Sequence, residues 1–232
     1  MQRTRSDPPF LRWAAAGFGL AAAGYAAYVA AAWGRYGRPA RPAPEEEDPL
    51  LDRFMPVYDV VERHQIRVDA PADVALAAAR DMPLFDRPFV RGIIRGRELL
   101  LGASPDERPR PRGLLAAAQA MGWAVLAERP GREIIAGAVT KPWEPDVTFR
   151  GLPPDEFAAF AEPAYVKIAW TLRADPVGPS RSVFRTETRA VATDAYARAR
   201  FRRYWALLSP GIILIRWLSR GPLRAEVARR RS

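Results

Sequence analysis

Residues 13–33, WAAAGFGLAAAGYAAYVAAAW, form the longest run of the chain without a charged side chain. At about 1.5 Å per helical residue, this run is long enough to cross a hydrocarbon core of about 30 Å. Trp13 and Trp33 stand at its ends, with Arg12 and Arg35 just outside, as is typical of residues at membrane–water interfaces. The pattern predicts a single transmembrane helix. A cleaved signal peptide and a buried alanine-rich helix are the alternatives.

The residues after this apolar run are rich in proline, glycine and charge. Residues 34–52 include GRYGRPARPAPEEEDP, a composition that favours an extended and solvated chain. We therefore expect a linker over 34–52. Residues 1–12, on the other side of the apolar run, are expected to be a basic tail.

Beyond the linker, polar and apolar residues alternate in several short segments, which is the pattern of half-buried strands. The alternating segments are 58–68, 123–127, 132–140, 164–174 and 182–190. Arg129-Pro130-Gly131 separates the second from the third and predicts a hairpin. Between the first strand and this hairpin, residues 72–80 and 85–97 have helical spacing.

The last long segment has helical periodicity. Its apolar positions follow one another at steps of three or four: Ala197, Phe201, Trp205, Leu208, Ile212 and Ile215. We expect this helix to start at Asp194 with Thr193 as its cap. Pro210 has no amide hydrogen, so it should kink the helix after Leu208 and place a cavity mouth at 209–211.

The order of elements is a strand, two helices, a run of antiparallel strands and a long C-terminal helix. This order predicts an α+β domain in which a curved antiparallel sheet buries the last helix on one face. We place the domain at 53–222, followed by a basic tail over 223–232.

Four stretches of the chain together resemble the START-like, or SRPBCC, superfamily. They are VVERHQIRVDAPADVALAAARDM, GWAVLAERPGREIIAGAV, EPAYVKIAWTLRADP and SVFRTETRAVATDAYARARFRRYW, and the resemblance covers about residues 57–220. The sequence RVDAPADVA is similar to the opening signature of that superfamily. The resemblance implies a helix-grip fold whose sheet wraps round the C-terminal helix and encloses an apolar cavity. It also implies a hydrophobic ligand, or a polyketide cyclase or aromatase activity, with no invariant catalytic set.

The net charge of +10 is concentrated at the two ends of the chain. Residues 1–44 hold six arginines and one aspartate, and residues 194–232 hold ten arginines and two acidic residues. The middle, 45–193, has 20 basic and 23 acidic residues and a net charge of −3. This distribution disfavours a nucleic-acid partner. It favours anionic lipid head groups near the basic ends.

The chain has no cysteine and one histidine. Disulfides, thiolate nucleophiles and multi-histidine metal sites are therefore excluded, and we expect neither a metal nor a cofactor. Glu62 and His64 share one face of the first predicted strand, where a carboxylate beside an imidazole could form a general acid–base pair. A solvent-exposed or purely structural pair is the alternative.

Eight further residues are expected to line an amphipathic pocket under the last helix: Trp170, Phe184, Thr186, Thr188, Phe201, Trp205, Leu208 and Ile212. For any one of these positions a place in a packed core is the favoured alternative, and the pocket is a prediction for the group.

These patterns predict a single-pass membrane protein whose START-like domain binds a hydrophobic small molecule or lipid without catalysis. A cyclase or aromatase using Glu62 and His64 is the first alternative, and a non-catalytic membrane adaptor with a packed interior is the second. Three arginines on each flank of the apolar run leave the side of the membrane undecided, with a slight preference for a cytoplasmic domain.

Overall fold

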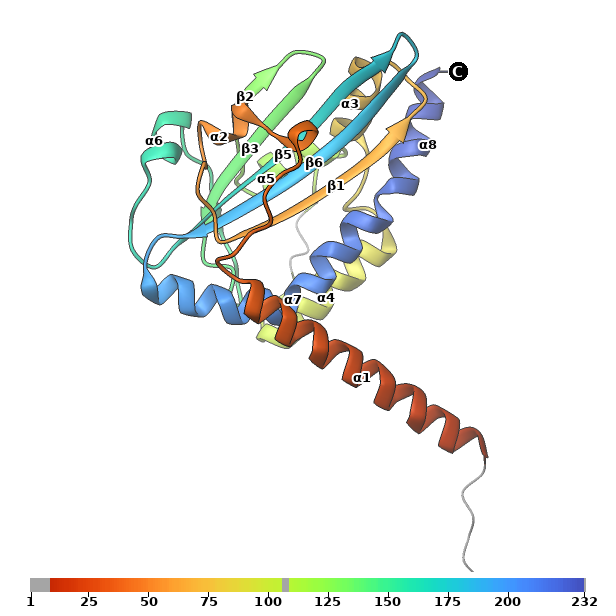
Figure 1. The fold of residues 1–232 in the computed structure, drawn as a ribbon, viewed down its shortest axis with the longest axis vertical. Coiled ribbons are helices and arrows are strands. Elements are labelled where there is room, and N and C mark those ends of the chain that lie inside the picture. The colour runs from red at the N-terminus through yellow and green to blue at the C-terminus, as the bar shows by residue number, and fades with distance from the viewer. Residues whose placement is uncertain (1–8, 106–108, 232) are drawn as a thin grey trace, which may run out of the picture.

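The computed structural model describes residues 9–105 and 109–231. In this part of the chain, six strands form one antiparallel sheet in the order β1-β6-β5-β3-β2, and the short β4 pairs with β3 (Figure 1). The strands are β1 (Val60–Val68), β2 (Ala124–Arg129), β3 (Glu133–Thr140), β4 (Phe149–Arg150), β5 (Val166–Gly178) and β6 (Arg181–Ala192). The predicted hairpin is confirmed as β2 and β3.

Helices surround this sheet. They are α1 (Pro9–Arg35), α2 (Pro49–Asp52), α3 (Ala72–Asp81), α4 (Pro88–Leu101), α5 (Leu114–Ala120), α6 (Pro154–Ala159), α7 (Ala195–Leu218) and α8 (Arg220–Arg231). The α+β class is confirmed, and the antiparallel sheet with its long C-terminal helix fits a helix-grip fold.

One face of the sheet, here called the inner face, packs against α3, α7 and α8. Alternate residues of the strands point to this side because side chains along a strand have a period of two. Leu172 of β5 and Phe184 of β6 pack with α3 and α8 in one buried cluster. Val60 of β1 packs with Phe201 and Trp205 of α7 in another. The sequence patterns that predicted the strands are therefore patterns of burial against these helices.

The opposite, outer face is covered by residues 44–58, which we call the strap, and by α6. Leu51 and Met55 of the strap are fully buried against Ile135 and Val139 of β3. The expectation of an extended, solvated linker over 34–52 is therefore wrong for its second half. Proline and acidic residues dominate the composition of that half, yet its few apolar residues are enough to anchor it on the sheet.

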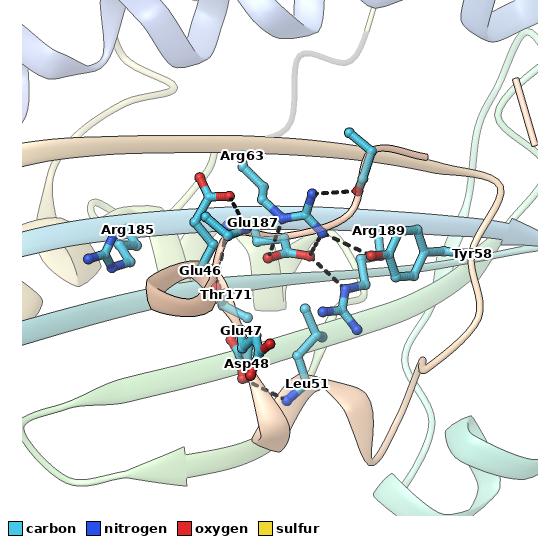
Figure 2. A network of polar contacts seen from close by, with 12 residues as sticks. Glu46, Glu47, Asp48, Leu51, Tyr58, Arg63, Thr171, Arg185, Glu187 and Arg189 are labelled. Atoms are coloured by element: carbon cyan, nitrogen blue, oxygen red, sulfur yellow. Dashed lines mark hydrogen bonds and ion pairs between the residues drawn. The ribbon is translucent and has the colours of Figure 1, made fainter. Parts of the chain in front are cut away.

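Polar side chains fill the space between the strap and the outer face. Figure 2 shows Arg63 and Arg189 converging on Glu187, whose carboxylate accepts bonds from their Nε atoms at 3.1 Å and 2.7 Å. Tyr58 of the strap accepts a bond from Arg63 Nη2 at 2.9 Å, and the Arg189 guanidinium lies 4.6 Å from the Tyr58 ring centroid. Arg189 also pairs with Asp52 of the strap at 2.5 Å, so two carboxylates balance the two guanidinium groups beneath the strap.

Helix α1 extends away from the domain, and its C-terminal part packs against α7 (Figure 1). Tyr25 donates to the Leu207 carbonyl at 2.7 Å, and the Tyr28 hydroxyl lies 2.9 Å from Ser209 Oγ. Ala32 is buried in this contact. Of the predicted basic tail, residues 1–8 lie outside the described residues.

None of the helices in the described part of the chain is both long enough and apolar enough to cross a membrane. The predicted transmembrane helix over 13–33 is therefore not supported. The segment does form a helix, but its uncharged character comes largely from alanine and glycine, whose side chains carry little apolar surface.

Helix α7 begins at Ala195, and its cap is Asp194, whose carboxylate accepts from the Ala197 amide at 2.6 Å. The expected cap, Thr193, instead hydrogen-bonds with the backbone of Tyr165. Pro210 lies inside α7, which changes direction along its course in Figure 1.

The bend of α7 is packed on two sides. Ser209 is fully buried beside Tyr28 of α1, and a Cβ added to Gly211 would lie 2.9 Å from Ile93 of α4. The expected cavity mouth at 209–211 is therefore closed by neighbouring helices.

Asp48 of the strap and Glu133 of β3 form a buried carboxylate pair, which makes the attachment of the strap sensitive to pH. Burial, followed by the neighbouring Asp48, raises the pKa of Glu133 to about 7. A carboxyl group with a raised pKa stabilises the fold at low pH, and this contribution is lost as pH rises through the folded-state value. We expect Asp48→Asn to reduce the loss of stability between pH 5 and pH 8 by on the order of 1 kcal/mol, because burial, the larger cause of the raised pKa, remains. Urea unfolding at a series of pH values measures this change.

Asparagine is also a good N-cap, so Asp48→Asn preserves the cap of α2. Glu128→Gln, at an exposed position on the adjacent β2, is the matched control and should leave the pH dependence unchanged. An identical pH profile for wild type and Asp48→Asn would contradict the prediction.

Candidate functional site

The register of β1 against β6 gathers four of the predicted site residues on the inner face. Glu62 pairs with Thr188, and His64 pairs with Thr186. Because directly paired residues of antiparallel strands point to the same face, a carboxylate, an imidazole and two hydroxyl groups lie next to one another. Sequence alternation predicted these faces correctly, but it could not predict which residues stand opposite one another.

A fifth polar group, Arg216 of α7, reaches this cluster from the helix side. Its Nη1 donates to Thr186 Oγ1 at 3.1 Å, and its Nη2 donates to Thr188 Oγ1. Sequence reasoning did not select Arg216 as a site residue. The signal that could have identified it is its position in the apolar run GIILIRWL, one helical turn after Ile212 on the buried side of the helix.

The cluster shifts the proton affinities of its members. Burial raises the pKa of Glu62, against the opposing positive charges of Arg216 and Arg35. Burial and the positive charges of Arg216 and Arg220 lower the pKa of His64 to about 4. Burial also lowers the pKa of Arg216 to about 10, opposed by Glu62. At neutral pH the imidazole is therefore neutral and the guanidinium is charged.

Glu62 and His64 form a loose pair. Their Oε2 and Nε2 atoms are 3.9 Å apart, and the buried Nε2 has no hydrogen-bond partner. The pair is mostly shielded, since the side chains of His64 and Glu62 are 15% and 24% exposed. An unsatisfied imidazole nitrogen beside a carboxyl group can accept or relay a proton.

Glu62 also stands on the wall of a cavity of about 340 Å³, which we call the Glu62 hollow. The hollow lies between the end of α1, residues 38–46, the first half of β1 and α7. Its lining is part aromatic and part charged: Tyr28, Ala32, Arg35, Tyr36, Arg38, Pro39, Ala40, Arg41, Glu46, Asp59, Val60, Val61, Glu62, Arg63 and Trp205. Two predicted residues, Glu62 and Trp205, therefore meet in one cavity.

Most acidic groups in this lining already have partners. Asp59 accepts from Tyr36 at 3.2 Å and pairs with Arg198 at 2.9 Å, while Glu46 accepts from the Ala43 amide. By contrast, the side chains of Arg38 and Arg41 have no hydrogen-bond or ion-pair partner within the described residues. The hollow therefore has unpaired positive charge.

The remaining predicted pocket residues lie in packed surroundings. Trp170 is half-buried with its ring centroid 6.0 Å from that of Trp123, and Phe184 and Phe201 are buried in two core clusters. Leu208 and Ile212 are half-buried on α7. Their role as ligand contacts stays a prediction.

The described residues contain no group of three or more histidine, cysteine or acidic side chains arranged to hold a metal ion. No protein-family model matches the chain, and a search of curated proteins likewise finds no match.

Solved structures with some similarity do exist. The Zhui aromatase/cyclase from Streptomyces sp. R1128 is 12% identical, with 74% of this chain and 95% of that chain covered and a TM-score of 0.26. A protein from Chromobacterium violaceum is 13% identical, with coverages of 67% and 96% and a TM-score of 0.26. The di-domain aromatase/cyclase BexL is 19% identical, with coverages of 72% and 44% and a TM-score of 0.25. Likeness at this level carries no argument about activity.

Arg216 is predicted to control the protonation of His64. Because His64 is the single histidine of the chain, its ring protons can be followed by NMR without overlap from another imidazole. We expect a titration midpoint near 4 in the wild type. Arg216→Met should move it toward the ordinary value of 6.5, because a buried positive charge no longer opposes protonation.

Arg67→Met is the control, since Arg67 is exposed on the same strand and should leave the midpoint unchanged. The lowered pKa also means that the unfolded chain takes up a proton before the folded one as pH falls from 6.5 toward 4, which destabilises the fold there. A midpoint near 6.5 in the wild type would disprove the buried, cation-flanked position of His64.

Proposed function

We propose that this protein binds a hydrophobic small molecule carrying an acidic group, and that the molecule occupies the Glu62 hollow. The observation that supports this most directly is the combination of aromatic walls and unpaired arginines in one cavity. Cavities of about 300 to 1,000 Å³ with apolar walls and a few polar groups are typical of small-molecule sites.

The apolar part of the ligand would contact the rings of Tyr28, Tyr36 and Trp205 together with the aliphatic Val60. Aromatic rings provide a large contact area with few rotatable bonds, so they hold a ligand at low entropic cost. These residues come from α1, from the segment after it, from β1 and from α7. The site therefore exists only when α1 is packed against the domain.

The acidic group would bind the guanidinium groups of Arg35, Arg38 and Arg41 at the α1 end of the hollow. Hydrogen bonds between a guanidinium and a carboxylate are among the strongest in proteins. Glu62 lies on the same wall, where its negative charge repels a second acidic group. The arrangement accordingly suits a ligand with one acidic end and an otherwise apolar body.

Two probe molecules test this proposal: 1-naphthoate, which has an aromatic body and one carboxylate, and 1-naphthalenemethanol, which lacks the charge. We expect isothermal titration calorimetry to show binding of both, with naphthoate bound more tightly. Arg35→Gln should weaken naphthoate binding about tenfold, because a charge-assisted hydrogen bond is lost, and leave the alcohol unaffected.

Arg181→Gln is the matched control, since Arg181 is an exposed arginine at the turn between β5 and β6. Trp205→Ala should weaken both probes alike. If neither probe binds, the proposal fails, and a packed adaptor becomes the better account of the domain.

A second candidate function is proton transfer at the same site, supported by the Glu62–His64 pair. The ionised Glu62 carboxylate would take a proton from the carbon next to a carbonyl group of a ligand in the hollow. The unpartnered Nε2 of His64, 3.9 Å from Glu62, could relay that proton. Such a step would correspond to the cyclase or aromatase alternative.

Deuterium exchange into the methyl group of 2-acetonaphthone, in D₂O and followed by NMR, tests this second function. We expect exchange above the buffer rate in the wild type and a loss of about a hundredfold of the excess rate in Glu62→Gln, because the base is removed. Glu98→Gln is the control, because Glu98 pairs with Arg95 on α4 and does not line the hollow; this variant should exchange at the wild-type rate. Exchange that is insensitive to Glu62→Gln would exclude a catalytic role for this carboxylate.

A further inference from the structure

The N-terminal part of α1 is an exposed apolar helix. Every side chain described from Gly17 to Ala27 is exposed, and Phe18 and Leu20 are 78% and 76% exposed. No charged residue lies between Trp13 and Trp33. Figure 1 shows this part of α1 beyond the edge of the domain, away from the sheet. A helix that is apolar on all sides is normally surrounded by apolar material on all sides.

The other end of α1 is firmly attached to the domain. Tyr25 and Tyr28 bind the α7 residues Leu207 and Ser209, and the Trp33 carbonyl accepts two bonds from Arg202, at 3.1 Å and 2.8 Å. The exposed part of α1 therefore continues directly from a helix whose last turns are held in place.

Positive charge gathers where α1 meets the domain. A second cavity, of about 380 Å³, is lined there by Gly34, Tyr36, Arg38, Ala195, Arg198, Ala199 and Arg202. We call it the arginine hollow. Arg198 pairs with Asp59, while Arg202 donates to a neutral carbonyl and lies over the Trp33 ring at 4.2 Å. Two of its three guanidinium groups thus keep an uncompensated charge.

We propose that α1 and the arginine hollow dock this protein on a membrane containing anionic lipid. The exposed part of α1, residues 17–27, contacts lipid acyl chains, and lipid phosphate groups bind Arg38 and Arg202. The uncompensated charges of Arg38 and Arg202 beside an exposed apolar helix match the anionic head groups and acyl chains of lipid, whereas a second copy of this chain would bring like charges together. Trp33 lies between the exposed apolar part of α1 and the arginines, and tryptophan side chains are enriched at the membrane–water interface. This inference does not depend on ligand binding in the Glu62 hollow.

Vesicle flotation of the purified full chain tests the proposal. The vesicles contain phosphatidylcholine alone or phosphatidylcholine mixed with phosphatidylglycerol. We expect the wild type to float with both and to bind the anionic vesicles more tightly, because each arginine near an anionic surface adds attraction. The double variant Phe18→Glu/Leu20→Glu should lose flotation with both compositions. Arg38→Gln/Arg202→Gln should lose at least about tenfold in affinity for the anionic vesicles alone.

Leu100→Glu and Arg181→Gln are the controls, since both replace exposed side chains on other elements, and each should float like the wild type. Circular dichroism checks that every variant folds. The proposal is overturned if the wild type fails to float, or if the Phe18→Glu/Leu20→Glu variant floats normally. It is also overturned if sedimentation without lipid shows a wild-type dimer that this variant dissociates, because α1 would then be covered by a second copy.

Discussion

The burial of β6 on both faces is the constraint on which the rest of this protein depends. Its inner residues, Phe184 among them, pack against helices, while its outer residues Glu187 and Arg189 lie beneath the strap. Charged groups can be buried there only because Arg63, Tyr58 and the strap backbone satisfy them. The strap is therefore a structural layer, and the domain starts earlier in the chain than a composition-based boundary suggests.

The same constraint produces the polar cluster on the inner face. Arg216 on α7 has to find partners where α7 crosses the sheet, and Thr186 and Thr188 provide hydroxyl groups at that point. A buried guanidinium without such partners would cost several kcal/mol. Together with burial, the positive charge of Arg216 then lowers the pKa of His64, and it opposes the rise that burial causes in the pKa of Glu62. The place where α7 crosses the sheet therefore holds both a buried guanidinium with its hydrogen-bond partners and the two candidate proton-transfer groups.

Helix α1 connects this site with the surroundings of the protein. Its last turns form one wall of the Glu62 hollow and one wall of the arginine hollow, while its first turns are exposed. The proposed membrane contact and the proposed binding site are thus neighbours that share Arg38. They are tested by different variants.

Sequence alone determined the local features of this protein. Alternation of polar and apolar residues placed the strands and their inner faces, and helical spacing placed α7, because both patterns record burial along a regular backbone. The apolar character of residues 13–33 was also evident, although their exposure in the structure was not.

Only the tertiary structure decided what these elements do together. The sequence did not reveal that Leu51 anchors a strap, that Arg216 meets Thr186 and Thr188, or that the cavity lies beside α1 and not at the bend of α7. Each of these facts depends on contacts between segments far apart in the chain. Such contacts are set by sheet register and helix crossing, for which a local pattern of residues carries no signal.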